Sequence, residues 1–191
     1  IRRVHVSTYQ AVSGSGVKGL RQMEQERLGE PVEEPAYGYR IDQNCIAQCD
    51  SFQENGYTKE EMKVANETRK ILEIPDLLIS ATAVRVPVRR GHSEAVSIEF
   101  TRPISVGEVR EILGSSAGVV LVDEPGKGAV PTALESEGHD EVYVGRIRED
   151  LAVPGIGINL WVVSDNLRKG AATNAVQILD SVVSLCACAA G

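Results

Sequence analysis

Ile79-Ser-Ala-Thr-Ala-Val-Arg85-Val-Pro-Val-Arg-Arg-Gly-His92-Ser-Glu-Ala-Val-Ser-Ile-Glu-Phe100 is the stretch that decides the fold. Its first part, to Val88, is rich in β-branched residues, and residues 95–100 alternate between apolar and polar, so both parts are typical of strands. Pro87 and Gly91 lie between them and favour a bend. Strands that follow each other without a helix between them indicate an α+β domain with a mixed, largely antiparallel sheet.

The flanking sequence supplies further strands and helices in an irregular order. Alternation predicts strands over 2–10, 119–122 (short and buried), 141–147 and 159–164, and helical spacing predicts helices over 17–28, 59–72, 106–113 and 168–187. Two capping boxes, Thr58-x-x-Glu61 and Ser105-x-x-Glu108, mark helix starts, and Asp165 is a candidate cap for the last helix. Residues 29–43 and 124–138 read as loops. No Gly-x-Gly-x-x-Gly follows a strand, so a complete Rossmann half is not expected.

Length and composition restrict the class of protein. The chain has 191 residues, 42% of them hydrophobic, which is enough for one domain over residues 1–191 with a sizeable core. A net charge of -7 argues against a nucleic-acid partner, and no apolar run approaches the roughly 20 residues that span a bilayer. No secretory signal is present, so a cytoplasmic location is predicted. The chain begins at Ile1 inside a strand-like segment, which we interpret as the start of a fragment.

The four cysteines form two close pairs, Cys45/Cys49 and Cys186/Cys188. A zinc site built from both pairs is one interpretation, but the spacings are not those of standard zinc sites. We instead predict no metal and four reduced thiols, most of them packed as small hydrophobic side chains.

Two pairs of charged residues are candidates for chemistry. Glu67 and Lys70 lie three apart on a predicted helix and form either a solvated surface pair or a site for a zwitterion. Arg85 and His92 form either an exposed basic strand end or a carboxylate-binding arginine beside a histidine suited to proton transfer. Their odd separation puts them on opposite faces of a regular strand unless the chain bends between them.

Two small-residue segments are further candidates. Gln10-Ala-Val-Ser13-Gly14-Ser-Gly16 follows a strand and is either an ordinary turn or a set of backbone N–H groups facing a phosphate or cofactor. Asp165-Asn166-Leu-Arg-Lys-Gly170 is either a helix cap or a place where a ligand approaches the backbone closely.

Taken together, these segments resemble bacterial aspartate-semialdehyde dehydrogenases. The residues that carry the resemblance are Val6–Gly14, Asp50–Met62, Asn66–Lys70, Ser80–Pro87, Gly91–Val96, Val144–Ile147, Asp165–Ala172 and Asn174–Gln177, in family order along the chain. The resemblance implies a domain like the C-terminal domain of glyceraldehyde-3-phosphate dehydrogenases, an α+β fold that forms homodimers.

The resemblance also implies a reaction and a set of roles. The family interconverts L-aspartate 4-semialdehyde and 4-aspartyl phosphate, with NADP, phosphate and a cysteine nucleophile. The expected positions are His92 as acid/base, Arg85 for the substrate carboxylate, Gln10 and Glu67 for the rest of the substrate, Lys70 for phosphate, and Ser13, Gly14 and Asn166 for NADP.

One departure from the family pattern is decisive. The family's nucleophile lies in a Pro-Asn-Cys-Ser/Thr motif ahead of the segment that matches Ile1, and the NADP-binding domain also precedes it. Asn44-Cys45 imitates the motif at the wrong place, so Cys45 is interpreted as a packing residue. We therefore expect this chain to be inactive alone, and the helix over about 166–187, including Val176, Leu179 and Val183, to be partly uncovered without the NADP-binding domain on which it packs.

Two alternatives stay open. One is a non-catalytic dimerisation module or pseudoenzyme. The other is a related N-acetylglutamyl-phosphate reductase, which Glu67 disfavours because an acetylated amine offers no cation for that carboxylate to bind.

Overall fold

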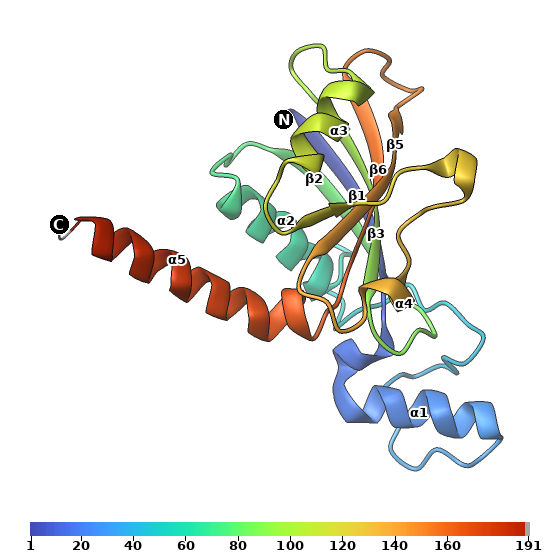
Figure 1. The fold of residues 1–191 in the computed structure, drawn as a ribbon. Coiled ribbons are helices and arrows are strands. Elements are labelled where there is room, and N and C mark those ends of the chain that lie inside the picture. Colours follow the sequence, from blue (N-terminus) through green and yellow to red (C-terminus); the bar gives the residue numbers. More distant parts are fainter. Residues whose placement is uncertain (190–191) are drawn as a thin grey trace.

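A mixed six-stranded sheet forms the centre of the computed structural model, which describes residues 1–189 (Figure 1). The strand order is β2-β1-β3-β6-β5-β4. The strands are β1 (Arg3–Gln10), β2 (Leu78–Arg85), β3 (His92–Glu99), β4 (Val119–Leu121), β5 (Val142–Glu149) and β6 (Gly157–Ser164). The β1/β2 and β4/β5 pairs are parallel, and the β1/β3, β3/β6 and β5/β6 pairs are antiparallel. The α+β class and the mixed, largely antiparallel sheet predicted from the sequence are confirmed.

The connection from β2 to β3 positions the site. These two strands do not pair with each other, because β1 lies between them. Residues 86–91 therefore cross over the end of β1, and the bend uses Gly91, whose φ of +87° favours glycine. A Cβ at Gly91 would also lie 2.8 Å from the carbonyl oxygen of Ala133. The crossing brings the end of β2 and the start of β3 to the same edge of the sheet as Gln10.

Two helices pack beside the sheet on the side that also carries the site. Helix α2 (Lys59–Ile71) packs against β2, and α3 (Val106–Gly114) packs against β4 and β5 at the other end of the sheet. Both predicted capping boxes form, with Thr58 paired to Glu61 and Ser105 paired to Glu108. Val109 of α3 joins the main core, which also contains Val144, Ile147, Ile158 and Leu160.

Helix α1 (Gly16–Leu28) and the loop that follows it form a second, smaller core. Its buried residues are Val12, Met23, Ile41 and Ile46. The side chain of Gln22 accepts hydrogen bonds from the amides of residues 36 and 37, and Glu26 accepts from those of residues 41 and 42. These bonds satisfy loop amides that are otherwise unpaired, so the loop is held against α1. Ile46 then pairs with Arg85 at the end of β2.

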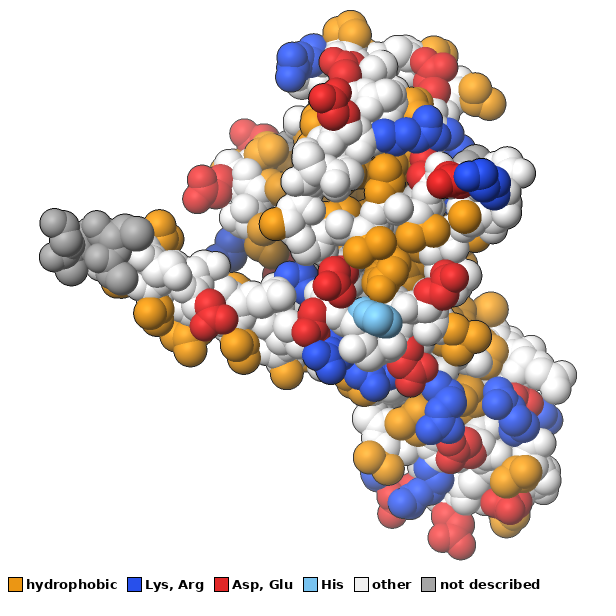
Figure 2. Space-filling view, in the orientation of Figure 1, with side chains coloured by type: hydrophobic (Ala, Val, Ile, Leu, Met, Phe, Trp, Pro, Cys, Tyr) orange, Lys and Arg blue, Asp and Glu red, His pale blue; other side chains and the backbone are white. Residues whose placement is uncertain are grey.

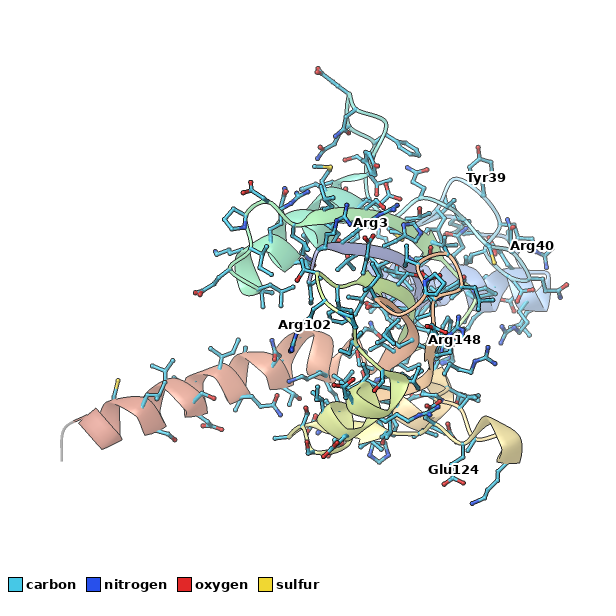
Figure 3. The ribbon with its side chains drawn as sticks, turned by 90° about the horizontal axis from the view of Figure 1, so that it is seen from above. Arg3, Tyr39, Arg40, Arg102, Glu124 and Arg148 are labelled. Carbon is cyan, nitrogen blue, oxygen red and sulfur yellow. The ribbon has the colours of Figure 1, made fainter. Side chains whose placement is uncertain are left out.

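The C-terminal helix leaves the body of the molecule. Asp165 is fully buried and accepts hydrogen bonds from the amides of Leu167 and Arg168, so it caps the turn as the sequence predicts. A π-helical turn over Arg168–Ala172 precedes α5 (Thr173–Ala189). In two perpendicular views α5 extends away from the sheet (Figures 1 and 3).

The structure differs from the sequence-based expectations in three places. The predicted loop over 124–138 contains a 3-10 turn, Pro125–Lys127, and a short helix, α4 (Ala133–Ser136), which Thr132 caps. Strand β4 is half-buried, not buried, because it is an edge strand. The last helix starts later than predicted because the π-helical turn occupies its first residues. Among residues 1–189, no helix is long and apolar enough to cross a membrane.

Candidate active site

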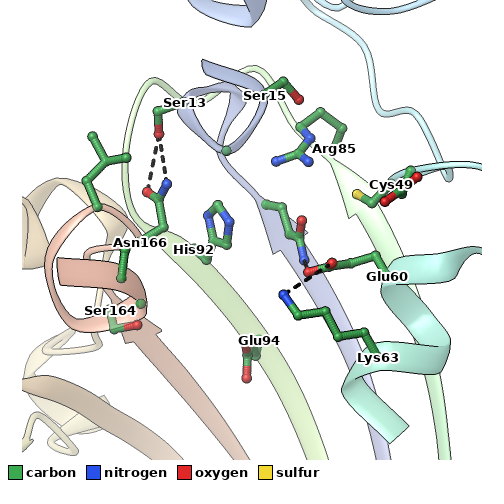
Figure 4. Close-up of a pocket in the computed structure, with 16 residues that line it drawn as sticks. Ser13, Ser15, Cys49, Glu60, Lys63, Arg85, His92, Glu94, Ser164 and Asn166 are labelled. Carbon is green, nitrogen blue, oxygen red and sulfur yellow. Dashed lines mark hydrogen bonds and ion pairs between the residues drawn. The ribbon is translucent and has the colours of Figure 1, made fainter. Parts of the chain in front are cut away.

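A cavity of about 610 Å³ opens at the edge of the sheet where β1 and β2 end and β3 begins (Figure 4). Gln10, Arg85 and His92 reach it from these three neighbouring strands, and α2 and the π-helical turn before α5 form its sides. The lining residues with polar or charged side chains are Gln10, Ser13, Ser15, Cys49, Asp50, Glu60, Lys63, Arg85, His92, Glu94, Ser164 and Asn166.

Arg85 is the buried cation of the cavity. The residue is 6% exposed, and its Nη1 donates a 2.6 Å hydrogen bond to the carbonyl oxygen of Ala11. Its Nε is buried and has no hydrogen-bond partner among the described residues. A buried guanidinium with a free donor is costly unless an anion pairs with it. The fork of donors suits a carboxylate, so Arg85 is equipped to bind one.

His92 lies on the other side of β1 and is neutral near physiological pH. Its Nδ1 accepts a 3.0 Å hydrogen bond from the amide of Ala11, so the ring proton belongs on Nε2. Burial, followed by the positive charge of Arg85, lowers the pKa of His92 to about 4. Arg85 and His92 thus bind the two polar groups of one residue, Ala11. The bend between the strands brings them to one cavity, as the functional interpretation of the sequence requires.

Gln10, between the two, connects the sheet to α2. Its side-chain amide donates a 3.3 Å hydrogen bond to Glu60 Oε1, and Lys63 Nζ lies 3.8 Å from the other carboxylate oxygen of Glu60. Both α2 residues face the cavity from the first turns of the helix (Figure 4). A carboxylate and an ammonium three residues apart therefore line the site.

The structure corrects the expected positions of Glu67 and Lys70. Neither lines the cavity, and both are exposed. The Glu-x-x-Lys pattern occurs twice on α2 with a seven-residue offset, which keeps the same helix face but moves the pair about 10 Å along the axis. The short connection over 72–77 makes α2 antiparallel to β2, so the start of α2 lies beside Arg85. That signal was present in the sequence, and it points to Glu60 and Lys63.

Ser13, Gly14 and Asn166, which were expected to contact NADP, lie in the cavity wall beside His92. Asn166 donates a 3.0 Å hydrogen bond to Ser13 Oγ and accepts one of 3.0 Å from the amide of Gly91. A Cβ at Gly14 would lie 2.7 Å from Arg85 Nη1 and 3.4 Å from the His92 ring. Gly14 therefore keeps the wall open at the point where a flat ligand group could approach His92.

Glu94 and Cys49 line the cavity without having been expected there. Burial raises the pKa of Glu94. Burial also raises the pKa of Cys49 to about 11, so its thiol stays protonated at neutral pH and is a poor nucleophile. A carboxyl two residues after a site histidine on a strand shares the histidine's face, and this periodicity could have predicted Glu94.

The other cysteines correct the packing expectation. Cys45 and Cys186 are exposed, so of the three thiols described only Cys49 packs as a buried hydrophobic side chain. Cys45 does not line the cavity. The side chain of Cys188 lies outside the described part of the structure. Among the described residues, no group of three His, Cys, Asp or Glu side chains could hold a metal ion.

The chain is similar to known proteins over most of its length. Residues 1–169 match the family model described as semialdehyde dehydrogenase, dimerisation domain. An aspartate-semialdehyde dehydrogenase of Legionella pneumophila is 46% identical over 94% of this chain and 53% of its own length. A crystal structure of aspartate semialdehyde dehydrogenase II from Vibrio cholerae, complexed with ASA, has a TM-score of 0.89 and 45% identity, covering 96% of this chain and 55% of that one.

A further similar structure is that of a complex with NADP. The aspartate semialdehyde dehydrogenase with NADP from Candida albicans has a TM-score of 0.61 and 28% identity, covering 87% of this chain and 46% of that one. The chain spans about half the length of the curated relatives it matches.

Proposed function

The chain belongs to the semialdehyde dehydrogenase family through its dimerisation domain, and from this premise we propose that it is the substrate-binding part of an NADP-dependent aspartate-semialdehyde dehydrogenase. The reaction interconverts L-aspartate 4-semialdehyde and 4-aspartyl phosphate with phosphate, a step in amino-acid biosynthesis. The observation that carries the proposal is the convergence of Arg85, Gln10 and His92 from three adjacent strands on one cavity.

Each polar group of the substrate has a matching residue. Arg85 binds the carboxylate, because its buried guanidinium has a free donor. Glu60 binds the substrate ammonium, held in place by Gln10, and Lys63 binds phosphate. These two take over the roles expected of Glu67 and Lys70. Glu60 also takes over the argument against an N-acetylated substrate, whose amide nitrogen carries no charge for a carboxylate to bind.

His92 acts at the aldehyde carbon. With Nδ1 occupied by the amide of Ala11, Nε2 carries the proton toward the cavity and donates a hydrogen bond to the substrate oxygen on which negative charge develops. To accept a proton from that oxygen at Nε2, the ring must give up the bond from Ala11 and move its proton to Nδ1. Acid/base work at His92 therefore includes a change in its contact with Ala11.

Ser13, Gly14 and Asn166 hold the nicotinamide end of NADP, which supplies the hydride acceptor when bound. The cavity's own thiol, Cys49, is unreactive at neutral pH because burial raises its pKa to about 11. We propose that the nucleophilic cysteine and most of the NADP site come from a part of the enzyme outside these residues, so that this chain alone has no dehydrogenase activity.

The unreactive thiol of Cys49 also favours a second candidate function, that of a non-catalytic dimerisation module. A cavity whose only thiol is unreactive is what a non-catalytic dimerisation module would carry. The two candidates differ in their need for substrate-binding groups, since a module that only dimerises has no use for a buried, unpaired arginine.

Homodimers are proposed through the sheet face that α2 and α3 leave uncovered. Tyr9 and Trp161 lie on it with ring centroids 5.3 Å apart, and Tyr9 is 38% exposed. Arg3 and Arg148 also lie on this uncovered face, at the positions labelled in Figure 3. A cytoplasmic location stays a prediction.

The decisive experiment measures binding of aspartate semialdehyde to the 191-residue chain by NMR titration, without phosphate or cofactor. We expect Arg85→Met to weaken binding by about 30-fold or more, because a charge-assisted pair contributes about 2 kcal/mol. Arg89→Met, which changes an exposed arginine outside the cavity, is the matched control. The proposal is contradicted if the wild-type and Arg85→Met chains bind the semialdehyde equally, or if the wild-type chain does not bind it. In either case the non-catalytic dimerisation module is the remaining candidate function.

A further inference from the structure

Glu94 is a cavity residue to which the proposed reaction gives no role. It lies on β3 two residues after His92 and therefore on the same face of the sheet. The rise of a strand places it about 7 Å further from the sheet edge than His92. It lines the cavity together with Lys63, and the two side chains lie in the lower part of the cavity in Figure 4.

Among the described residues, the carboxyl of Glu94 has no hydrogen-bond or ion-pair partner. Thr8 on β1 and Val162 on β6 are its neighbours in the sheet. The hydroxyl of Thr8 is itself buried and has no hydrogen-bond partner among the described residues. Burial is the single cause that raises the pKa of Glu94, because no described hydrogen bond or nearby charge offsets it. A half-buried carboxyl of this kind is stabilised by a group that shares a proton with it or brings a positive charge.

The charged groups around the cavity indicate which ligand that is. Glu60 and Lys63 face it from α2, Arg85 and His92 from the strands, and Asp50 from the loop. In the proposed function, Arg85 binds the carboxylate of the substrate and Glu60 binds its ammonium group. The oxyanion bound by Lys63 is then the remaining ligand group that Glu94 can contact. An ionised carboxylate repels a fully deprotonated oxyanion, whereas one proton between the two converts the repulsion into a strong hydrogen bond.

This requirement separates two common oxyanions. Inorganic phosphate keeps at least one P–OH group at neutral pH and can supply the shared proton. Sulfate has the same shape but is fully deprotonated at that pH and cannot supply it. A site of this design rejects the anion that lacks the hydrogen, since one of its own polar groups would be left unpaired.

We propose that Glu94 is a specificity-determining residue that selects hydrogen phosphate over sulfate by sharing one proton with the oxyanion bound at Lys63. This inference rests on the proposed function, because the phosphate site at Lys63 belongs to that proposal. It adds a residue and a selection rule to the site.

The test titrates the 191-residue chain with sodium phosphate and with sodium sulfate at pH 7 and constant ionic strength, followed by amide NMR shifts in β3 and α2. We expect the wild-type chain to bind phosphate at least about tenfold more tightly than sulfate, as the loss of one charge-assisted hydrogen bond implies. In Glu94→Gln the carboxamide donates to either anion, so we expect the two affinities to come within about threefold, mainly because sulfate binds more tightly.

Two further variants complete the design. Glu111→Gln makes the same change at an exposed position of α3 and should keep the wild-type preference. Lys63→Met should lose both anions. An unchanged preference in Glu94→Gln, or a wild-type chain that binds both anions equally or neither, overturns the assignment. If the semialdehyde still binds through Arg85 in such a case, only the role of Glu94 falls and the proposed function stands.

Discussion

His92 is oriented by a backbone amide and not by a carboxylate. In many catalytic sites an acidic side chain holds the histidine and raises its basicity. Here the amide of Ala11 donates to Nδ1, and the guanidinium of Arg85 adds a positive charge nearby. Both contacts favour the neutral ring with its proton on Nε2. The same amino acid, Ala11, also accepts from Arg85 through its carbonyl oxygen, so the positions of the two side chains depend on one peptide segment.

The first prediction concerns the titration of His92. The pKa of His92 is lowered to about 4, well below its ordinary value of about 6.5, so the ring should stay neutral through mildly acidic solution. Nitrogen NMR shifts of the ring, followed against pH, should report the Nε2–H form throughout that range. A midpoint near the ordinary value would contradict the structure.

This lowered pKa has a consequence for stability. As pH falls from about 6.5 to about 4, the unfolded chain takes up a proton at this position that folded His92 does not. The free energy of unfolding should therefore decrease over that range, and His92→Gln should remove this part of the decrease. Urea denaturation of both chains at several pH values would measure it.

At the level of residues, the sequence identified six of the sixteen residues that line the cavity. Arg85, His92, Gln10, Ser13, Gly14 and Asn166 all line the cavity, as expected. The α2 residues were misplaced because Glu60-x-x-Lys63 and Glu67-x-x-Lys70 have the same spacing on the same helix face. Periodicity along a helix identifies which face a residue lies on but not how far along the axis the functional residues lie. Only the packing of α2 against β2 shows which of the two pairs lies at the cavity.

At the level of elements, the start of α2 is fixed to the sheet by one side chain. Glu61 accepts from the amide of Thr58 through Oε2 and from the amide of Ala83 on β2 through Oε1. The first bond belongs to the capping box, and the second satisfies a donor on the outer side of the edge strand β2. The helix turn that carries Glu60 and Lys63 is thereby held beside Arg85.

The second prediction compares the two capping boxes. Glu61→Ala should lower the free energy of unfolding by about 2–3 kcal/mol, because it leaves two amides of a buried region without partners. Glu108→Ala removes the equivalent residue from the exposed box of α3 and should cost about 1 kcal/mol or less. Urea denaturation of the two variants would measure the difference. Equal losses would mean that the bond to Ala83 contributes nothing.

Elements with strong local signals were predicted well, and those set by tertiary contacts were not. Capping boxes and alternation located α2, α3 and the long strands to within a few residues. Helix α4 was missed because it has a single turn, with too few residues for a periodic pattern. The π-helical turn before α5 accompanies contacts distant in the sequence, where Arg168 and Thr173 both donate to Asp140.

At the level of the whole molecule, α5 presents an apolar surface to solvent. Figure 2 shows hydrophobic side chains along the projecting helix. Val176, Leu179 and Val183 are each between 57% and 60% exposed, which confirms that they are uncovered. Packing of α5 on an NADP-binding domain stays a proposal, and the exposed face is the surface that such a domain would cover.

The third prediction tests that surface. Replacing Val176, Leu179 and Val183 with glutamine should reduce the binding of an apolar dye to the chain and leave the unfolding midpoint of the sheet within a few degrees of the wild type. The reason is that α5 lies apart from the sheet and main core, so these side chains stabilise little of the body. A large fall in the midpoint would show that α5 packs on the body in solution.

Because residues 86–91 cross over the end of β1, the sheet also limits the length of a ligand that contacts both Arg85 and His92. With β1 between them, the backbones of β2 and β3 are held about 10 Å apart by two ladders of hydrogen bonds. The two side chains reach toward each other from these backbones, since a Cβ at Gly14 would lie 2.7 Å from Arg85 Nη1 and 3.4 Å from the His92 ring. A molecule held at Arg85 and altered at His92 must bridge the shorter gap that remains between them. The spacing of the strands thus selects substrates by their length. A substrate with one carbon more or fewer between its carboxylate and its aldehyde would need side chains at these two positions that reach less far or further into the cavity.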